Sequence, residues 1–188
     1  MDLPASLAMD LIVSRSPDGT WRAAFGTRRW RCAIGPAGVS ADKREGDGAT
    51  PLGCFPLRRV LYRSDRLARP ETFLAATPLA PEDGWCDDPR DAAYNTQVRQ
   101  PFAAGHERLW RDDGIYDAIV ILGHNDRPPR PGAGSAIFLH VARDDYAPTQ
   151  GCVALALPDL LTVLREAGPE TRVCVTAGET PIRRDRGS

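Results

Sequence analysis

Glycine and proline interrupt this chain too often for it to be built from long helices. The 188 residues include 17 glycines and 17 prolines, and both residue types favour turns and disrupt regular helices. The apolar stretches between these breaks are short, and several are rich in β-branched residues, which are common in strands. The sequence therefore predicts a mainly β fold. The chain is long enough for one domain with its own hydrophobic core.

Seven stretches have the apolar and β-branched content expected of strands. The strongest signal is the run Ala-Ile-Val-Ile-Leu at residues 118–122. Pro56 places its own strand at a sheet edge or at a bulge, because proline donates no backbone hydrogen bond. The predicted strands are residues 10–14, 20–25, 28–34, 54–62, 116–122, 136–142 and 171–176.

One convincing helix is predicted, over residues 158–167. Pro158 suits a first helical turn, leucines recur on one face, and Gly168 with Pro169 ends the pattern. A further single helical turn is predicted at residues 106–110. The rest of the chain is expected to consist of strands and turns.

The composition shows no shift that would divide the chain. We expect a single domain over residues 9–177, preceded by a short lead-in at residues 1–8 and followed by a charged tail at residues 178–188. The net charge is −1 and the pI is near 6.3, which does not favour a nucleic-acid partner. No apolar run approaches the length of a membrane span. Residues 1–10 lack the basic start of a secretory signal.

Five cysteines occur, and their spacing does not suggest a zinc site. They form no Cys-x-x-Cys pair and have no partner histidines in a metal-binding pattern. Their odd number leaves at least one thiol unpaired, and Cys152 is the candidate. Cys32, Cys54, Cys86 and Cys174 are interpreted as small apolar residues in or beside strands.

His140 and Cys152 have the pattern of a catalytic base and a nucleophile. His140 ends a predicted strand, and Cys152 directly follows Gly151 at the start of another apolar run. A thiol becomes nucleophilic when a base takes its proton, and backbone N–H groups stabilise the oxyanion that follows. Either residue alone is more often a buried structural side chain. Their combination favours a cysteine nucleophile activated by His140.

Five segments, in this order, make the chain resemble the YkuD-type L,D-transpeptidase catalytic domain, a family of cysteine enzymes that remodel peptidoglycan. They are residues 47–55 (Asp-Gly-Ala-Thr-Pro-Leu-Gly-Cys-Phe), 94–95 (Tyr-Asn), 123–126 (Gly-His-Asn-Asp), 134–140 (Gly-Ser-Ala-Ile-Phe-Leu-His) and 151–152 (Gly-Cys). The resemblance implies a YkuD-like β-sandwich or barrel of mixed strands with one or two short helices. It also implies a periplasmic or cell-envelope location, and no cofactor or metal.

The resemblance further implies a reaction on peptidoglycan stem peptides, which serve as donor and acceptor. Cys152 is expected to attack a tetrapeptide stem and release its terminal D-alanine, giving a thioester. An amine then completes a 3→3 cross-link, or water completes a carboxypeptidase reaction. His140 is the expected base, oriented by the carbonyl of Val141, and its partnership with Cys152 is expected to lower the pKa of the thiol. The N–H groups of Gly151 and Cys152 are the expected oxyanion donors.

Four further residues are candidates for lining the substrate groove. They are Tyr94, His124, Asn125 and Gln150. For the first three, loop-stabilising hydrogen bonds are an equally good interpretation.

Two departures from the family pattern keep other functions open. The spacer between His140 and Cys152 is short, and Gln150 stands where most members have a histidine; glutamine forms hydrogen bonds but does not titrate. A cell-wall-binding module that has lost turnover is one alternative. A generic cysteine amidase or peptidase acting on ordinary L-peptides is the other. The sequence leaves the oligomeric state open.

Overall fold

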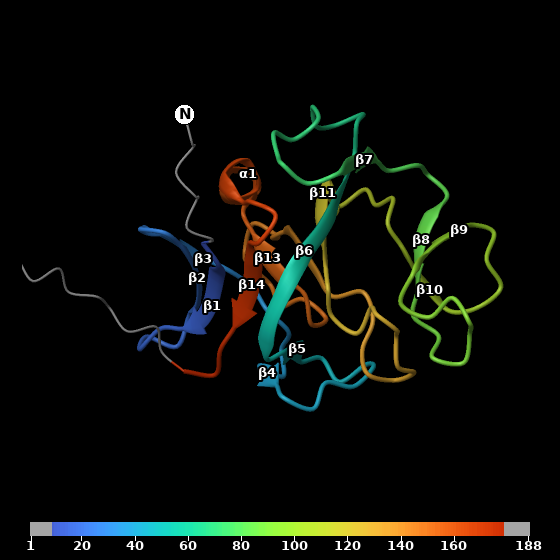
Figure 1. Ribbon diagram of the computed structural model, residues 1–188, viewed down its shortest axis with the longest axis horizontal. Helices are drawn as coiled ribbons and strands as arrows, with labels where there is room; N and C mark the ends of the chain where they lie inside the picture. The colour runs from blue at the N-terminus through green and yellow to red at the C-terminus, as the bar shows by residue number, and fades with distance from the viewer. Residues whose placement is uncertain (1–8, 179–188) are drawn as a thin grey trace, which may run out of the picture.

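The computed structural model describes residues 9–178, and this part of the chain is mainly β (Figure 1). The expected fold class is confirmed, with a single short helix among the described residues. The elements are β1 (Leu11–Arg15), β2 (Trp21–Phe25), β3 (Arg28–Arg31), β4 (Val39–Ser40), β5 (Thr50–Pro51), β6 (Gly53–Tyr62), β7 (Ala76–Pro78), β8 (Asp83–Cys86), β9 (Gln97–Arg99), β10 (His106–Arg108), β11 (Ala118–Leu122), β12 (Phe138–Val141), β13 (Val153–Leu155), α1 (Leu157–Glu166) and β14 (Arg172–Val175).

The largest sheet curves until its two ends meet. Its strand order is β13-β12-β11-β6-β14-β1-β2-β3, with β7 beside β6. Just beyond β3, Ala33 pairs with Ala154 of β13 through two backbone hydrogen bonds of 2.9 Å. This bridge joins the outer strands, so the sheet forms a nearly closed barrel. The sequence did not predict this closure, because it joins segments about 120 residues apart.

β6 is the long central strand of this barrel and is visible as the teal arrow in Figure 1. Its first half pairs with β14, and its second half pairs with β11. The predicted edge position of Pro56 is therefore wrong. The alternative prediction, a bulge, agrees better with the structure. The register between β6 and β11 shifts at residue 58, between the pairs Leu57–Leu122 and Arg59–Ile121.

α1 packs its apolar face against the barrel. The prediction of a helix at residues 158–167 is confirmed within one residue, and Pro158 lies in the first turn. Leu160, Val163 and Leu164 are fully buried in the main hydrophobic cluster, together with residues of β1, β6, β11, β12, β13 and β14. Burying an apolar side chain of this size contributes about 1.5–3 kcal/mol, so α1 is held mainly by this face.

The predicted helical turn at residues 106–110 is wrong. Residues 106–108 form β10, the edge of a second sheet with the order β10-β8-β9. His106 pairs there with Cys86 in antiparallel register. A five-residue pattern is too short to form a helix without support, and pairing with β8 provides the competing structure.

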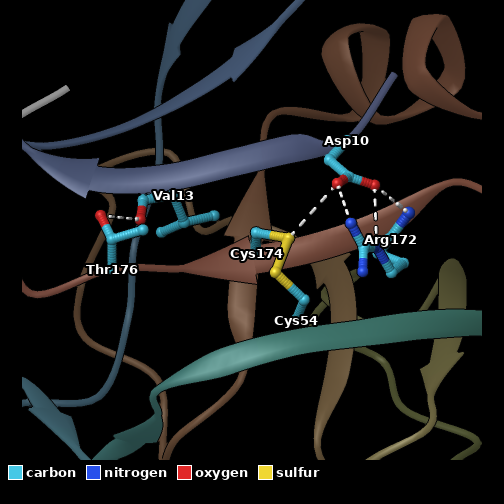
Figure 2. Close-up of a disulfide and its surroundings, with 6 residues drawn as sticks. All are labelled: Asp10, Val13, Cys54, Arg172, Cys174 and Thr176. Atoms are coloured by element: carbon cyan, nitrogen blue, oxygen red, sulfur yellow. Dashed lines mark hydrogen bonds and ion pairs between the residues drawn. A yellow bond between two sulfur atoms is a disulfide. The ribbon is translucent and has the colours of Figure 1, made fainter. Parts of the chain in front are cut away.

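Cys54 and Cys174 form a disulfide, which corrects their interpretation as separate small apolar residues. They are direct cross-strand partners of β6 and β14 (Figure 2). Asp10 and Arg172 form an ion pair of 2.6 Å at the same place, and Cys174 Sγ lies 3.6 Å from Asp10 Oδ2. The guanidinium of Arg172 lowers the pKa of Asp10. Cys32, Cys86 and Cys152 are free and buried, and the expectation of an unpaired Cys152 is confirmed.

Removing the disulfide should lower stability substantially. The bridge closes a loop across a sequence separation of 120 residues, and a link over such a distance restricts the unfolded chain strongly. We expect the double variant Cys54→Ala/Cys174→Ala to lose about 2–5 kcal/mol of unfolding free energy, measured by urea denaturation. Dithiothreitol should destabilise the native protein by a similar amount and leave the double variant unchanged. Equal urea midpoints for the native and variant proteins would contradict a stabilising role.

Within residues 9–178, no helix has the length and apolar character needed to cross a membrane. The predicted lead-in at residues 1–8 lies outside the described residues, as does the predicted tail at residues 178–188 except for residue 178.

Candidate active site

Neighbouring parallel strands bring His140 and Cys152 to one cavity. β12 carries His140, and Cys152 immediately precedes β13. His140 pairs with Ala154 in the parallel register. Because alternate residues of a strand point to the same face, Cys152 and Ala154 share the face of His140. All three residues line a cavity of about 600 Å³.

The Cys152 thiol is held by two backbone groups. Its Sγ donates a hydrogen bond to the carbonyl oxygen of Ala136 at 3.1 Å and accepts one from the N–H of Phe138 at 3.4 Å. Burial raises the pKa of Cys152 to about 12, and the negative charge of Glu107 acts in the same direction. The N–H of Phe138 opposes this shift, because it stabilises a negative sulfur.

The His140 ring is held by one backbone contact and one aromatic neighbour. Its Nδ1 lies 2.9 Å from the carbonyl oxygen of Val141, the contact that the resemblance implied. A carbonyl only accepts hydrogen bonds, so Nδ1 carries the proton and Nε2 is the free base. The ring packs edge-on against Tyr116, with centroids 5.2 Å apart. Burial lowers the pKa of His140 to about 4.

The expected lowering of the cysteine pKa is wrong. Burial is the main cause of the shift at both Cys152 and His140, and it disfavours the thiolate and the imidazolium alike. The resting site therefore holds a neutral thiol and a neutral imidazole.

Gly151 occupies a backbone position that other residues do not tolerate. Its φ is +128°, and a Cβ at this place would lie 2.8 Å from the carbonyl oxygen of Ala49. Its N–H donates to Thr149 Oγ1 at 3.1 Å, and the same hydroxyl donates to the carbonyl of Cys152 at 2.7 Å. The Gly151 N–H would have to leave Thr149 before it could face an oxyanion.

A Gly151→Ala variant should be destabilised by about 2–4 kcal/mol, because backbone strain and overlap with Ala49 add together. Urea denaturation measures this loss. Gly132→Ala is the matched control, since Gly132 has a φ of +77° but no atom near the added Cβ. We expect this control to lose only about 1 kcal/mol. Equal losses in the two variants would show that the approach to Ala49 carries no cost.

The structure divides the other predicted site residues between different places. Gln150 lines the cavity of Cys152. His124 and Asn125 line a second cavity of about 560 Å³, beside Lys43 and Arg130. Asn125 binds the backbone of residues 130 and 134, and His124 Nε2 lies 3.0 Å from the carbonyl of residue 133. Their hydrogen bonds therefore hold the loop at residues 124–134.

Tyr94 is buried and donates its hydroxyl hydrogen bond to Glu45. Its neighbour Asn95 is connected to the Cys152 sulfur through hydrogen bonds to Ala136. The side-chain oxygen of Asn95 accepts hydrogen bonds from Trp85 Nε1 at 2.9 Å and from the N–H of Ala136 at 3.0 Å. Since the carbonyl of Ala136 accepts the thiol hydrogen bond, Asn95 fixes the segment that holds Cys152.

Several residues of the cavity were not identified from the sequence. They are Glu45, Asp87, Glu107, Arg111, Tyr116 and Arg143. They come from loops and short strands with no shared motif, so only the folded chain brings them together. Among residues 9–178, no group of three or more histidine, cysteine or acidic side chains is arranged to hold a metal ion.

The barrel holds a buried thiol and a buried imidazole beside one cavity, at the adjoining parallel strands β12 and β13. The family model for the YkuD L,D-transpeptidase catalytic domain matches residues 15–175. The chain belongs to this family, which acts on peptidoglycan.

Two solved structures are similar to this chain over 90% of its length. They are L,D-transpeptidase 1 of Mycobacterium tuberculosis, with 12% identity, and an L,D-transpeptidase of Mycobacterium smegmatis, with 13% identity; the TM-score is 0.38 for each. The match covers 62% of the first chain and 59% of the second, so this chain spans about three-fifths of their length. No curated protein matches the chain.

Proposed function

We propose that this protein is a cysteine-dependent L,D-transpeptidase that forms a thioester between Cys152 and a peptidoglycan tetrapeptide stem. The observation that carries this proposal is that Cys152 and His140 line the same cavity, with His140 Nδ1 bonded to the carbonyl of Val141. Family membership supports the choice of peptidoglycan as the substrate.

In the proposed reaction, the Sγ proton passes to His140 Nε2 as the sulfur attacks the carbonyl before the terminal D-alanine. The imidazolium then donates this proton to the leaving amine of D-alanine, and the thioester remains. An amine of a second stem, or water, attacks the thioester and restores the thiol. Burial raises the pKa of Cys152 and lowers the pKa of His140, so it disfavours the charged form of each side chain. A thiolate–imidazolium pair therefore forms only transiently, when the two opposite charges stabilise each other.

The disulfide supports a location in the periplasm or cell envelope. Disulfides persist in oxidising compartments and are rare where thiols are kept reduced. The Cys54–Cys174 bridge suits such a compartment, as does a peptidoglycan substrate.

Product analysis on a purified disaccharide-tetrapeptide tests the proposal. We expect release of D-alanine, together with a cross-linked dimer or a disaccharide-tripeptide, detected by mass spectrometry. Casein in a parallel incubation should remain uncut, which separates this activity from that of a general peptidase. Cleavage of casein without release of D-alanine would replace the proposal with the peptidase alternative.

A binding module without turnover is the second candidate, and the raised pKa of Cys152 is the observation that favours it. A carbapenem distinguishes the two, because only a working nucleophile opens its ring. The transpeptidase should gain the mass of one carbapenem per chain. Binding of muropeptides without an adduct or product would instead establish the module.

A further inference from the structure

The second sheet contacts the candidate active site through one cross-strand pair. Trp85 of β8 and Glu107 of β10 are direct partners in the antiparallel register, and side chains at such opposed positions stand on the same face of a sheet. Trp85 packs edge-on against Phe138 of β12, with ring centroids 5.1 Å apart, and Glu107 lines the Cys152 cavity. This face of the second sheet therefore lies against the barrel, beside the cavity.

Trp85 is connected to Cys152 through a series of hydrogen bonds. Its Nε1 donates to the side-chain oxygen of Asn95 at 2.9 Å, and the same oxygen accepts from the N–H of Ala136 at 3.0 Å. The carbonyl of Ala136 in turn accepts the hydrogen bond of the thiol at 3.1 Å. The position of Trp85 thus bears on the segment that holds the sulfur.

Glu107 is connected to His140 through Tyr116. The Tyr116 hydroxyl donates a hydrogen bond of 2.6 Å to Glu107 Oε1. Its ring packs edge-on against the imidazole, with centroids 5.2 Å apart and the two planes at 82°. Tyr116 is only 4% exposed, although it lines the cavity. A tyrosine bonded at its hydroxyl and packed on its ring has little freedom to turn, so it presents a fixed surface to the imidazole.

The backbone beside Tyr116 holds the same histidine. The carbonyl of Ile115 accepts a hydrogen bond of 3.1 Å from the N–H of Val141. The carbonyl of Val141 lies 2.9 Å from His140 Nδ1. Ile115 therefore fixes the residue whose carbonyl orients the imidazole, while Tyr116 packs against the ring. Two consecutive residues act on His140 through separate contacts.

The bond between Tyr116 and Glu107 holds side chains in place and transfers no proton. Burial raises the pKa of Tyr116 well above its usual value, and a negative charge at Cys152 raises it further. The phenol therefore keeps its proton and remains a donor to Glu107. Glu107 needs only an acceptor oxygen for this bond, and a side-chain amide would supply one equally well.

We propose that Tyr116 and Glu107 are positioning residues for His140, so that the cross-strand pair Trp85–Glu107 supports both the base and the nucleophile. This inference rests on the proposed function, because the two residues act through the proposed base. A base must lie within hydrogen-bond reach of the proton that it takes. An imidazole that is already held meets this condition without being ordered during the reaction.

Nitrogen-15 NMR of the His140 imidazole tests the proposal without any peptidoglycan, and His140→Gln identifies the signals. The native ring should carry its proton on Nδ1 and titrate near pH 4. Tyr116→Leu leaves a space that opens into the cavity, because Tyr116 lines it. Water then reaches the imidazole, so the midpoint of its titration should rise by at least about one pH unit towards 6.5. An unchanged midpoint would overturn the proposal.

The rate of thioester formation separates the hydrogen bond from the charge of Glu107. Tyr116→Phe removes the donor and Glu107→Ala removes the acceptor, so each should slow the maximal rate about threefold to tenfold without changing the half-saturating concentration of tetrapeptide. The double variant should be no slower than the slower single variant, since both changes remove one bond. Glu107→Gln keeps an acceptor and should react at the native rate or faster, because the charge of Glu107 raises the pKa of Cys152.

Tyr62→Leu is the matched control. Tyr62 of β6 is 6% exposed and does not line the cavity, so its loss should cost similar stability in urea and leave the His140 titration and the rate unchanged. Additive losses in the double variant, or a folded Glu107→Gln protein as slow as Glu107→Ala, would overturn the proposal. If the native protein forms no thioester but the His140 midpoint moves in Tyr116→Leu alone, the proposed function fails and the positioning of His140 stands.

Discussion

A Cys152→Ala variant is expected to release D-alanine from a disaccharide-tetrapeptide at least about 10⁴-fold more slowly than the native protein. The substitution removes the only group in the proposed reaction that bonds to the substrate. The side chain is small and buried, with two hydrogen bonds to the backbone, so the fold should survive its loss. The rate is measured by coupled detection of D-alanine, and the carbapenem adduct should vanish in the same variant.

Cys32→Ala is the matched control for this prediction. Cys32 is also free and buried, and burial raises its pKa to about 12 as well. It does not line the Cys152 cavity. The control variant should keep both turnover and the adduct. An adduct that persists in Cys152→Ala and disappears in Cys32→Ala would place the nucleophile elsewhere.

A His140→Gln variant is expected to slow formation of the thioester by about 10²–10⁴-fold, the usual effect of removing a general base. Glutamine retains an N–H donor for the carbonyl of Val141 and fills much of the buried space. It has no nitrogen that takes a proton near neutral pH. Single-turnover mass spectrometry measures the acylated fraction with time. His106→Gln is the control, and it should react at the native rate.

The pH dependence adds a second test of His140. A base works in its unprotonated form, and the pKa of His140 is lowered to about 4. The rate should therefore persist as the pH falls from 7 and decline only near 4. The lowered pKa of His140 also makes the folding stability depend on pH. An unfolded histidine gains its proton near pH 6.5, so the stabilising contribution of the neutral His140 declines as the pH falls from about 6.5 towards 4. Circular dichroism at each pH separates this loss from the chemistry. A rate that fell already at pH 6 in folded protein would contradict the role of His140 as a buried neutral base.

The sequence predicted the elements that local patterns determine. α1 has proline at its start, a leucine face and a Gly-Pro end, and each signal lies within the helix or beside it. β11 is apolar over its whole length. β8, β9 and β10 have no such pattern, because each is short and exists only through pairing with the others. The predicted turn at residues 106–110 failed for this reason.

The same distinction applies to the site. His140 and Cys152 were identified because the sequence motifs that contain them follow the order found in the family. Both residues line the same cavity. The Cys54–Cys174 bridge depends on a contact between distant segments, and no local signal marks it. The pKa shift of Cys152 was predicted with the wrong sign, because burial of the thiol is a property of the folded chain.

The bridge between Ala33 and Ala154 has a consequence for behaviour at high concentration. Outer strands of an open sheet offer unpaired N–H and C=O groups, to which another molecule is able to add a strand. Here Ala33 and Ala154 bond to each other, so the N–H and C=O groups in these two bonds are not available to an added strand. Addition of a strand from a second molecule should therefore not begin at this pair.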